Sequence, residues 1–133
     1  LALALAAPAD VVAQALRVLD DPALAWLFGP GSLAEVGFAL PWSGQVLAGS
    51  IDRLVVTEKV VTVVDYKSNA VVPTRAEEVP EGYLRQLGAY AAAMQALYPE
   101  RQIETAILWT SEARMMRMGR DIVSAALARA TTA

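Results

Sequence analysis

Two stretches in the first half of the chain, 46–57 and 61–67, alternate with a period of two, and a third stretch, 33–40, is also predicted as a strand. Such alternation is typical of β-strands, because successive side chains point to opposite faces of a sheet. The predicted strands cover 33–40, 46–57 and 61–67. Short turns separate them, at 41–44 and at the pair Glu58 and Lys59. Two consecutive antiparallel hairpins are therefore the simplest connection.

Elsewhere the apolar residues recur every three or four positions, which predicts amphipathic helices, or form short continuous runs, which predict buried strands. The predicted helices cover 9–19, 22–28, 81–98 and 121–130, and the further strands cover 103–109 and 115–118. In the long helix the expected core stripe is Leu84, Leu87, Ala91, Met94 and Leu97 or Tyr98. This order of elements predicts an α/β domain with helices packed around a small sheet.

The second hairpin brings two carboxylates and an ammonium group together. Asp65 and Lys67 are two apart on one strand and share a face. If the Glu-Lys pair centres the turn, Asp52 lies opposite Asp65. Facing like charges destabilise a ladder, and a divalent cation such as Mg²⁺, which takes oxygen ligands, would remove that penalty. From the residues alone, two unrelated surface aspartates and a solvated lysine remain an equally good interpretation.

Other polar residues are predicted to join these carboxylates. Alternation puts Ser50 and Asp52 on one strand face, and a four-residue turn before them would place Glu35 opposite Ser50 and diagonal to Asp52. Gln86 and Tyr90 are four apart on the long helix, so they are neighbours on a face beside its apolar stripe. A solvated glutamate, and a solvated glutamine next to a tyrosine at the core margin, are the alternatives for these residues.

Composition removes several classes of function. The 133 residues contain no cysteine and no histidine, which excludes disulfides, thiolate metal sites, histidine bases and the usual zinc sites within this chain. Eleven basic and fourteen acidic residues give a net charge of −3, so any contact with DNA is local or relies on other protein. No stretch approaches the roughly 20 apolar residues that span a bilayer. A bound metal would need oxygen ligands.

Four motifs in this order resemble the restriction-endonuclease-like, or PD-(D/E)xK, nuclease superfamily: GSIDRLVV, VVDYKSN, VPEGYLRQLGAYAAAMQALYP and ETAILWT. They are most similar to the C-terminal nuclease domain of AddA-type helicase-nucleases, which are relatives of the RecB nuclease domain. The resemblance covers 20–118. It implies one nuclease domain over 1–133, built on a central mixed β-sheet flanked by helices, as a C-terminal piece of a much longer helicase-nuclease.

The resemblance also implies roles for the residues of the second hairpin. Asp52 and Asp65 would bind Mg²⁺ or Mn²⁺, with the backbone carbonyl of Tyr66 and the carboxylate of Glu35 as further ligands. Asp52, Asp65 and Lys67 would be the catalytic residues. In that role Lys67 would orient or activate the attacking water and stabilise negative charge at the phosphate.

On the long helix, Gln86 and Tyr90 match the family's Gln-x-x-x-Tyr motif, which is expected to brace the site or position the DNA strand. One feature departs from the family pattern. A histidine on a helix upstream of the first strand usually contributes to the metal site, and this chain has none. Either the sequence begins after that helix or the protein has lost the residue.

By resemblance, the chain is a metal-dependent DNA exonuclease domain of an ATP-dependent helicase-nuclease for double-strand break repair and recombination. We expect it in the bacterial cytoplasm at the nucleoid, without a membrane, receiving single-stranded DNA from the motor and assembling with an AddB-like subunit. ATP would bind only in the missing helicase portion, because no Walker-type loop occurs here. We expect the isolated chain to cleave DNA poorly or not at all. The alternatives are a catalytically dead docking or DNA-guiding module and a stand-alone nuclease of the same superfamily.

Overall fold

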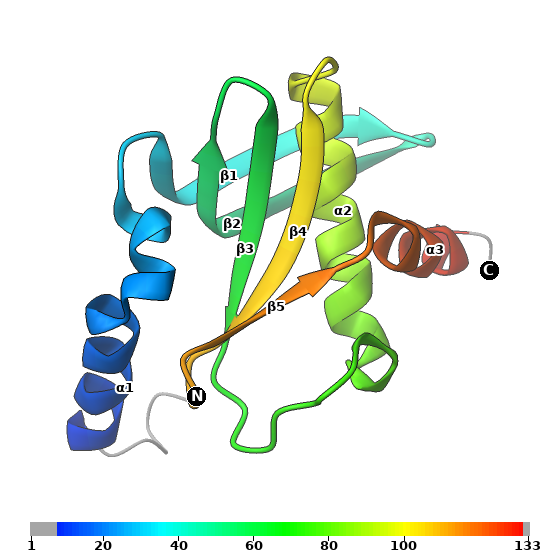
Figure 1. Ribbon diagram of the computed structural model, residues 1–133. Helices are drawn as coiled ribbons and strands as arrows, with labels where there is room; N and C mark the ends of the chain where they lie inside the picture. Colours follow the sequence, from blue (N-terminus) through cyan, green and yellow to red (C-terminus); the bar gives the residue numbers. More distant parts are fainter. Residues whose placement is uncertain (1–7, 132–133) are drawn as a thin grey trace.

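The computed structural model describes residues 8–131, and its helices and strands follow the predicted order (Figure 1). They are α1 (Pro8–Asp20), η2 (Pro22–Phe28), β1 (Ser32–Trp42), β2 (Gln45–Val56), β3 (Val60–Lys67), η3 (Ala76–Glu78), α2 (Glu81–Leu97), β4 (Gln102–Trp109), β5 (Arg114–Met118) and α3 (Arg120–Thr131). The elements η2 and η3 are 3₁₀ helices, and η3 lies between the predicted strand 61–67 and the predicted helix 81–98. Across the described residues, no helix combines the length and the apolar character needed to cross a membrane.

The strands form one mixed sheet in the order β1-β2-β3-β4-β5. Neighbours are antiparallel except β3 and β4, which are parallel. A parallel pair needs a crossover connection, and α2 supplies it between these two strands. The predicted mixed sheet flanked by helices is therefore confirmed.

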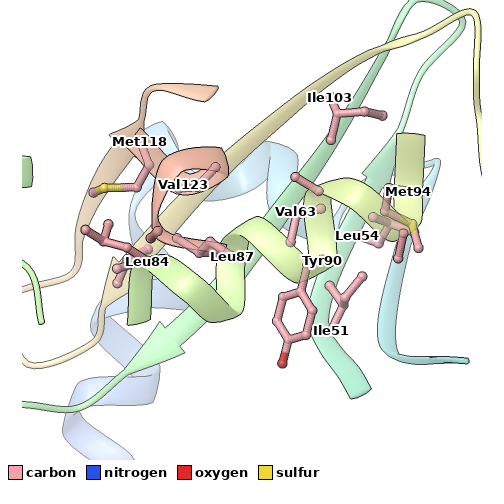
Figure 2. Packing of buried hydrophobic residues seen from close by; sticks show 14 of the residues in the cluster. Ile51, Leu54, Val63, Leu84, Leu87, Tyr90, Met94, Ile103, Met118 and Val123 are labelled. Carbon is pink, nitrogen blue, oxygen red and sulfur yellow. The ribbon is translucent and has the colours of Figure 1, made fainter. Parts of the chain in front are cut away.

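Each face of the sheet has its own hydrophobic core. On the face covered by α2 and α3, which we call the α2 face, the predicted stripe residues Leu84, Leu87, Ala91 and Met94 are buried against the strands and α3 (Figure 2). On the opposite face, here the α1 face, a smaller core joins the end of α1 and η2 to the sheet. Its buried members are Val18, Leu24, Leu27, Val55, Val64 and Leu108. The long helix therefore packs as its periodicity predicts.

α1 forms where it was predicted, but most of its apolar residues remain exposed. Val12, Leu16 and Leu19 have exposed fractions of 56%, 51% and 58%, whereas Val18 is buried. Figure 1 shows α1 beside the sheet rather than across its centre. The amphipathic pattern of this helix therefore contributes little to the core of the described chain.

α2 and α3 approach each other closely at Gly88. A Cβ atom at this position would lie 2.2 Å from the carbonyl oxygen of Val123 and 3.0 Å from the Leu127 side chain. Backbone at that distance cannot yield without moving the helix. Gly88 is therefore needed for α3 to pack where it does.

The β2–β3 hairpin has the predicted register. Arg53 pairs with Val64, and the turn is formed by the Glu-Lys pair. The Thr57 hydroxyl donates to the Val60 carbonyl oxygen at 2.9 Å and accepts from the Val60 amide at 3.1 Å. These bonds support a two-residue turn whose own residues are not those that such turns favour.

The predicted turn of the β1–β2 hairpin is wrong. Trp42 pairs with Gln45, so the turn consists of Ser43 and Gly44 rather than four residues. The φ angles of Ser43 and Gly44 are 51° and 77°. Left-handed conformation at both central residues is characteristic of a type I′ turn, which matches the twist of paired strands.

The shorter turn shifts the register of this hairpin by two residues. Ser50 faces Gly37 and not Glu35, as had been predicted. The pairs on either side of Glu35 place it across from Asp52. The correction therefore moves Glu35 from a diagonal position to one directly opposite the Asp52 backbone.

Candidate functional site

β2 changes face at Asp52, and this change positions the first carboxylate. Ile51 and Leu54 both lie in the α2-face core although they are three residues apart, so strict alternation fails between them. Arg53 contacts the Tyr66 hydroxyl on the opposite face. Because Asp52 lies within this twist, its carboxylate Oδ2 can accept from the Tyr66 backbone amide at 2.8 Å.

The twist also corrects a prediction about β2. Ser50 was expected to share a face with Asp52, but Ser50 is exposed and its neighbour Ile51 is fully buried. A regular alternation assumes a flat, regularly pleated strand. At Asp52 the regularity is lost, because the Tyr66 amide bonds the Asp52 carboxylate and not a backbone carbonyl of β2.

Asp65 lies on β3 at the position that the confirmed register sets opposite Asp52. Only 4% of the residue is exposed. Burial raises the pKa of Asp65 to about 6, because burial disfavours the charged form; Lys67 lowers this pKa, and the Asp52 carboxyl raises it. The structure therefore brings the two carboxyl groups together, as the hairpin argument predicted.

Lys67 is the cation of the group. Its Nζ lies 2.9 Å from Asp65 Oδ2 and donates a hydrogen bond to Gln86 Oε1 at 3.2 Å. The contact with Asp65 is an ion pair without hydrogen-bond geometry, since Asp65 Oδ2 has no hydrogen-bond donor among the described residues. The ammonium compensates part of the Asp65 charge but meets the oxygen outside hydrogen-bond geometry, so this buried carboxylate can still bind a further partner.

Gln86 and Tyr90 reach the site from α2. The Tyr90 ring packs in the core, perpendicular to Phe38 at 5.5 Å, and lies close over Gly49, where a Cβ atom would be 3.1 Å from the ring. Burial raises the pKa of the Tyr90 hydroxyl, and the charges of Asp65 and Asp52 raise it further. Tyr90 therefore has both predicted roles: its ring packs in the core, and its hydroxyl end lies near the two carboxylates of the site.

Glu35 does not complete a three-carboxylate group. It is exposed, and its φ of 53° lies in the left-handed region that is uncommon for residues with a Cβ. Between residues 8 and 131, no three acidic, histidine or cysteine side chains gather as a metal-binding group. The predicted clustering of Glu35 with Asp52 and Asp65 is therefore wrong, because it assumed regular strand geometry, and the left-handed φ of Glu35 interrupts that geometry although the corrected register places the residue across from Asp52.

Two residues beside Lys67 were missed from the sequence. The Lys67 Nζ lies 4.4 Å from the centroid of the Tyr83 ring, and the Tyr83 hydroxyl exchanges hydrogen bonds with the Asn69 side chain. Tyr83 lies three residues before Gln86, so helical spacing placed it on the same side of α2. That spacing was the signal that could have identified it.

A second polar cluster occupies the opposite face of the same strands. Arg53 Nη1 donates to the Ser32 hydroxyl at 3.0 Å, and Arg53 Nε donates to the Tyr66 hydroxyl at 3.3 Å. The guanidinium carbon also lies 4.9 Å from the centroid of the Phe28 ring. These contacts connect η2, β1, β2 and β3, and they were not predicted.

The residues of the α2 face fit a divalent metal. Hard cations such as Mg²⁺ take carboxylate and carbonyl oxygens. Asp52 and Asp65 supply two facing carboxyl groups, and Asp65 Oδ2 is a buried oxygen without a donor. Asp52 and Asp65 are therefore the residues that could hold the ion. The Tyr66 carbonyl stays a prediction.

The family model described as the PD-(D/E)XK nuclease superfamily matches residues 4–130. The chain therefore belongs to the PD-(D/E)XK nuclease superfamily, and its mixed sheet flanked by helices is consistent with the restriction-endonuclease-like fold. Nucleases of this superfamily typically use divalent metals.

No curated protein matches the chain. Among solved structures, one titled "Crystal structure of SSO0001" is similar to it with 11% sequence identity and a TM-score of 0.43. The match covers 93% of this chain and 69% of that one.

Proposed function

We propose that the chain is a nuclease domain that hydrolyses DNA phosphodiester bonds with Mg²⁺ or Mn²⁺ at Asp52 and Asp65. The observation that carries the proposal is the buried Asp65 carboxylate, which faces Asp52 and lies 2.9 Å from the Lys67 ammonium. Two facing carboxylates and one lysine contribute little to stability on a sheet face that is otherwise a hydrophobic core. They form a good reaction centre once a cation is held between the acids.

In this proposal each residue of the site has its own role in metal binding or in the reaction. Asp52, Asp65 and the Tyr66 carbonyl hold the ion, which supplies Lewis-acid polarisation of the phosphate and a more acidic water. The Tyr66 backbone amide fixes the Asp52 carboxylate at 2.8 Å. Lys67 orients the attacking water and places positive charge where the phosphate gains negative charge.

Gln86 and Tyr90 act from α2 in the proposed site. The Gln86 amide oxygen accepts from Lys67, so it keeps the ammonium near Asp65. The Tyr90 hydroxyl end is close enough for both carboxylates to raise its pKa. We infer that the pair braces the site and contacts the DNA strand.

We further propose an AddA-like helicase-nuclease as the setting, with ATP used only by a separate motor and with an AddB-like partner subunit. The support is the sequence resemblance of the four motifs, from GSIDRLVV to ETAILWT. In that setting the motor delivers one DNA strand for break repair and recombination. The net charge of −3 supports weak binding and weak cleavage by the isolated chain.

A second candidate is a nuclease fold that has lost cleavage and serves as a docking or DNA-guiding module. The absence of histidine from the sequence favours it, because the family's upstream histidine usually contributes to the metal site. The intact group of Asp52, Asp65 and Lys67 opposes it. The two candidates differ in one measurable property, metal-dependent cleavage.

The test uses the full-length protein, and it compares Asp65→Ala with the matched control Asp20→Ala, an exposed aspartate at the end of α1. Asp65→Ala should abolish Mg²⁺-dependent cleavage of single-stranded DNA while ATP-driven unwinding continues, and Asp20→Ala should retain both. Wild-type protein that unwinds DNA but cleaves none would support the docking module. If Asp65→Ala lost both cleavage and unwinding, the result would mean that Asp65 supports folding of the protein and not the chemical step.

A further inference from the structure

The Lys67 ammonium is surrounded by groups from two elements. Asp65 Oδ2 on β3 lies at 2.9 Å, Gln86 Oε1 on α2 lies at 3.2 Å, and the Tyr83 ring centroid on α2 lies at 4.4 Å. Lysine carries its charge on a flexible four-carbon stem, so no single contact fixes its position. The ring face attracts the cation and also closes one side of it with an apolar surface.

The Tyr83 ring is itself held in place. Its hydroxyl accepts from Asn69 Nδ2 at 3.2 Å and donates to Asn69 Oδ1 at 3.3 Å. Its centroid lies 6.3 Å from that of Trp109, which is fully buried and pairs with Lys67 on the neighbouring strand. A ring anchored at its hydroxyl and packed against a buried indole cannot swing away from the ammonium freely.

The segment that carries Asn69 is anchored in turn. The Ser111 hydroxyl donates to the Asn69 carbonyl oxygen at 2.7 Å, and the Thr110 amide donates to the Lys67 carbonyl oxygen at 2.9 Å. These bonds fasten the chain after β3 to the chain after β4. Asn69 therefore gives the Tyr83 hydroxyl a fixed support rather than a mobile loop.

We propose that Tyr83, supported by Asn69, is a positioning residue that fixes the Lys67 ammonium beside Asp65. Tyr83 acts through Lys67 and is not itself a catalytic residue. The catalytic consequence rests on the proposed nuclease function. The contact between ring and ammonium does not, and it can be measured alone.

The contact is tested by NMR of the chain labelled with ¹³C,¹⁵N-lysine. The sequence has two lysines, and Lys59 in the exposed β2–β3 turn is an internal reference. Shielding by the ring should move the ε-proton signals of Lys67 upfield of those of Lys59. Tyr83→Phe, which keeps the ring beside Trp109 but loses the hydrogen bonds to Asn69, should retain part of this shift, and Tyr83→Leu should abolish it. Equal shifts for both lysines in the wild type would overturn the proposal, whatever the variants do.

A matched control comes from the other end of α2. There the Arg101 guanidinium carbon lies 4.9 Å from the Tyr98 ring centroid, which is the same kind of contact away from the site. Tyr98→Leu should leave the Lys67 signals unchanged. A Lys67 shift that disappears in Tyr98→Leu as well would show a general loosening of α2 and would overturn the specific role of Tyr83.

The catalytic consequence is tested in the full-length protein. Tyr83→Leu should lower kcat about 10-fold with little change in KM, and Tyr83→Phe should keep most of the wild-type rate. When Lys67→Met is already present, Tyr83→Leu should cause no further loss. An equal loss with and without Lys67, or a change in KM alone, would overturn the positioning role. An inactive wild type that still shows the Lys67 shift would refute the nuclease proposal and leave the ring contact standing.

Discussion

The same two strands, β2 and β3, carry polar clusters on both faces of the sheet, and the clusters differ in how well their members match. On the α1 face the Arg53 guanidinium has two hydroxyl acceptors and an aromatic ring. On the α2 face, Asp52 and Asp65 face each other, and Asp65 Oδ2 has no directed donor among the described residues. Buried polar groups that all have hydrogen-bond partners stabilise a fold (here the matched cluster), whereas buried polar groups that lack such partners (the unmatched cluster) indicate a ligand or a reaction.

The largest effect on stability should follow from breaking the matched cluster. Arg53→Met keeps the length of the side chain but leaves Ser32 and Tyr66 without their donor. We expect it to lower the free energy of unfolding by about 2 kcal/mol, since Arg53 is half-buried and its bonds are charge-assisted. Urea unfolding measures the change. A loss equal to that of Arg17→Met, at an exposed position on α1, would contradict the assignment.

Removing the Asp65 charge from the α2-face cluster should stabilise the protein above pH 6, whereas Arg53→Met destabilises it. The effect at Asp65 should also depend on pH. The pKa of Asp65 is raised from 3.8 to about 6, chiefly by burial. The folded state therefore holds this proton more tightly than the unfolded state, and its contribution to stability is present below pH 4 and is lost as the pH rises through 6. In EDTA, wild-type protein should lose stability over this range relative to Asp65→Asn. Parallel curves for the two proteins would show that Asp65 is not the group responsible.

The smallest effects should come from the α2 residues next to the unmatched cluster. Gln86→Ala removes an acceptor of Lys67, and Tyr90→Phe removes only a hydroxyl from a ring that stays packed. Each should lower the cleavage rate of the full-length protein by roughly 10-fold, and Tyr90→Phe should shift the unfolding free energy by less than about 1 kcal/mol. Unchanged cleavage in both variants would return the pair to ordinary packing.

The sequence predicted the features that depend on local periodicity and on one turn. The core stripe of α2 followed from its helical spacing, and the position of Asp52 opposite Asp65 followed from a turn at the Glu-Lys pair, which the Thr57 hydroxyl supports. Both features are determined by residues close together in the chain. The mixed sheet followed from the family resemblance, together with the order of the elements.

Other features could not be predicted because they depend on backbone conformation. The register of the β1–β2 hairpin depends on the left-handed φ angles of Ser43 and Gly44. A serine in the sequence does not indicate such an angle, because residues with a Cβ rarely adopt it. At Asp52, β2 stops alternating regularly between the two faces of the sheet. There the Tyr66 backbone amide donates to the Asp52 carboxylate instead of to a backbone carbonyl of the neighbouring strand. The spacing of Tyr83 from Gln86 indicates its side of α2, but the contact of its ring with Lys67 joins two elements across the parallel crossover and does not follow from that spacing alone.

Electron paramagnetic resonance of bound Mn²⁺ shows whether Asp52 and Asp65 hold a divalent metal between them. The chain is titrated with Mn²⁺ near pH 7.5, where Asp65 is ionised, and Asp65→Asn and Asp20→Asn are titrated alongside it. We predict one tight Mn²⁺ per chain in the wild type and in Asp20→Asn, and loss of that ion in Asp65→Asn. Retention of the same bound Mn²⁺ by Asp65→Asn would exclude Asp65 as a ligand of the ion and with it the proposed metal site.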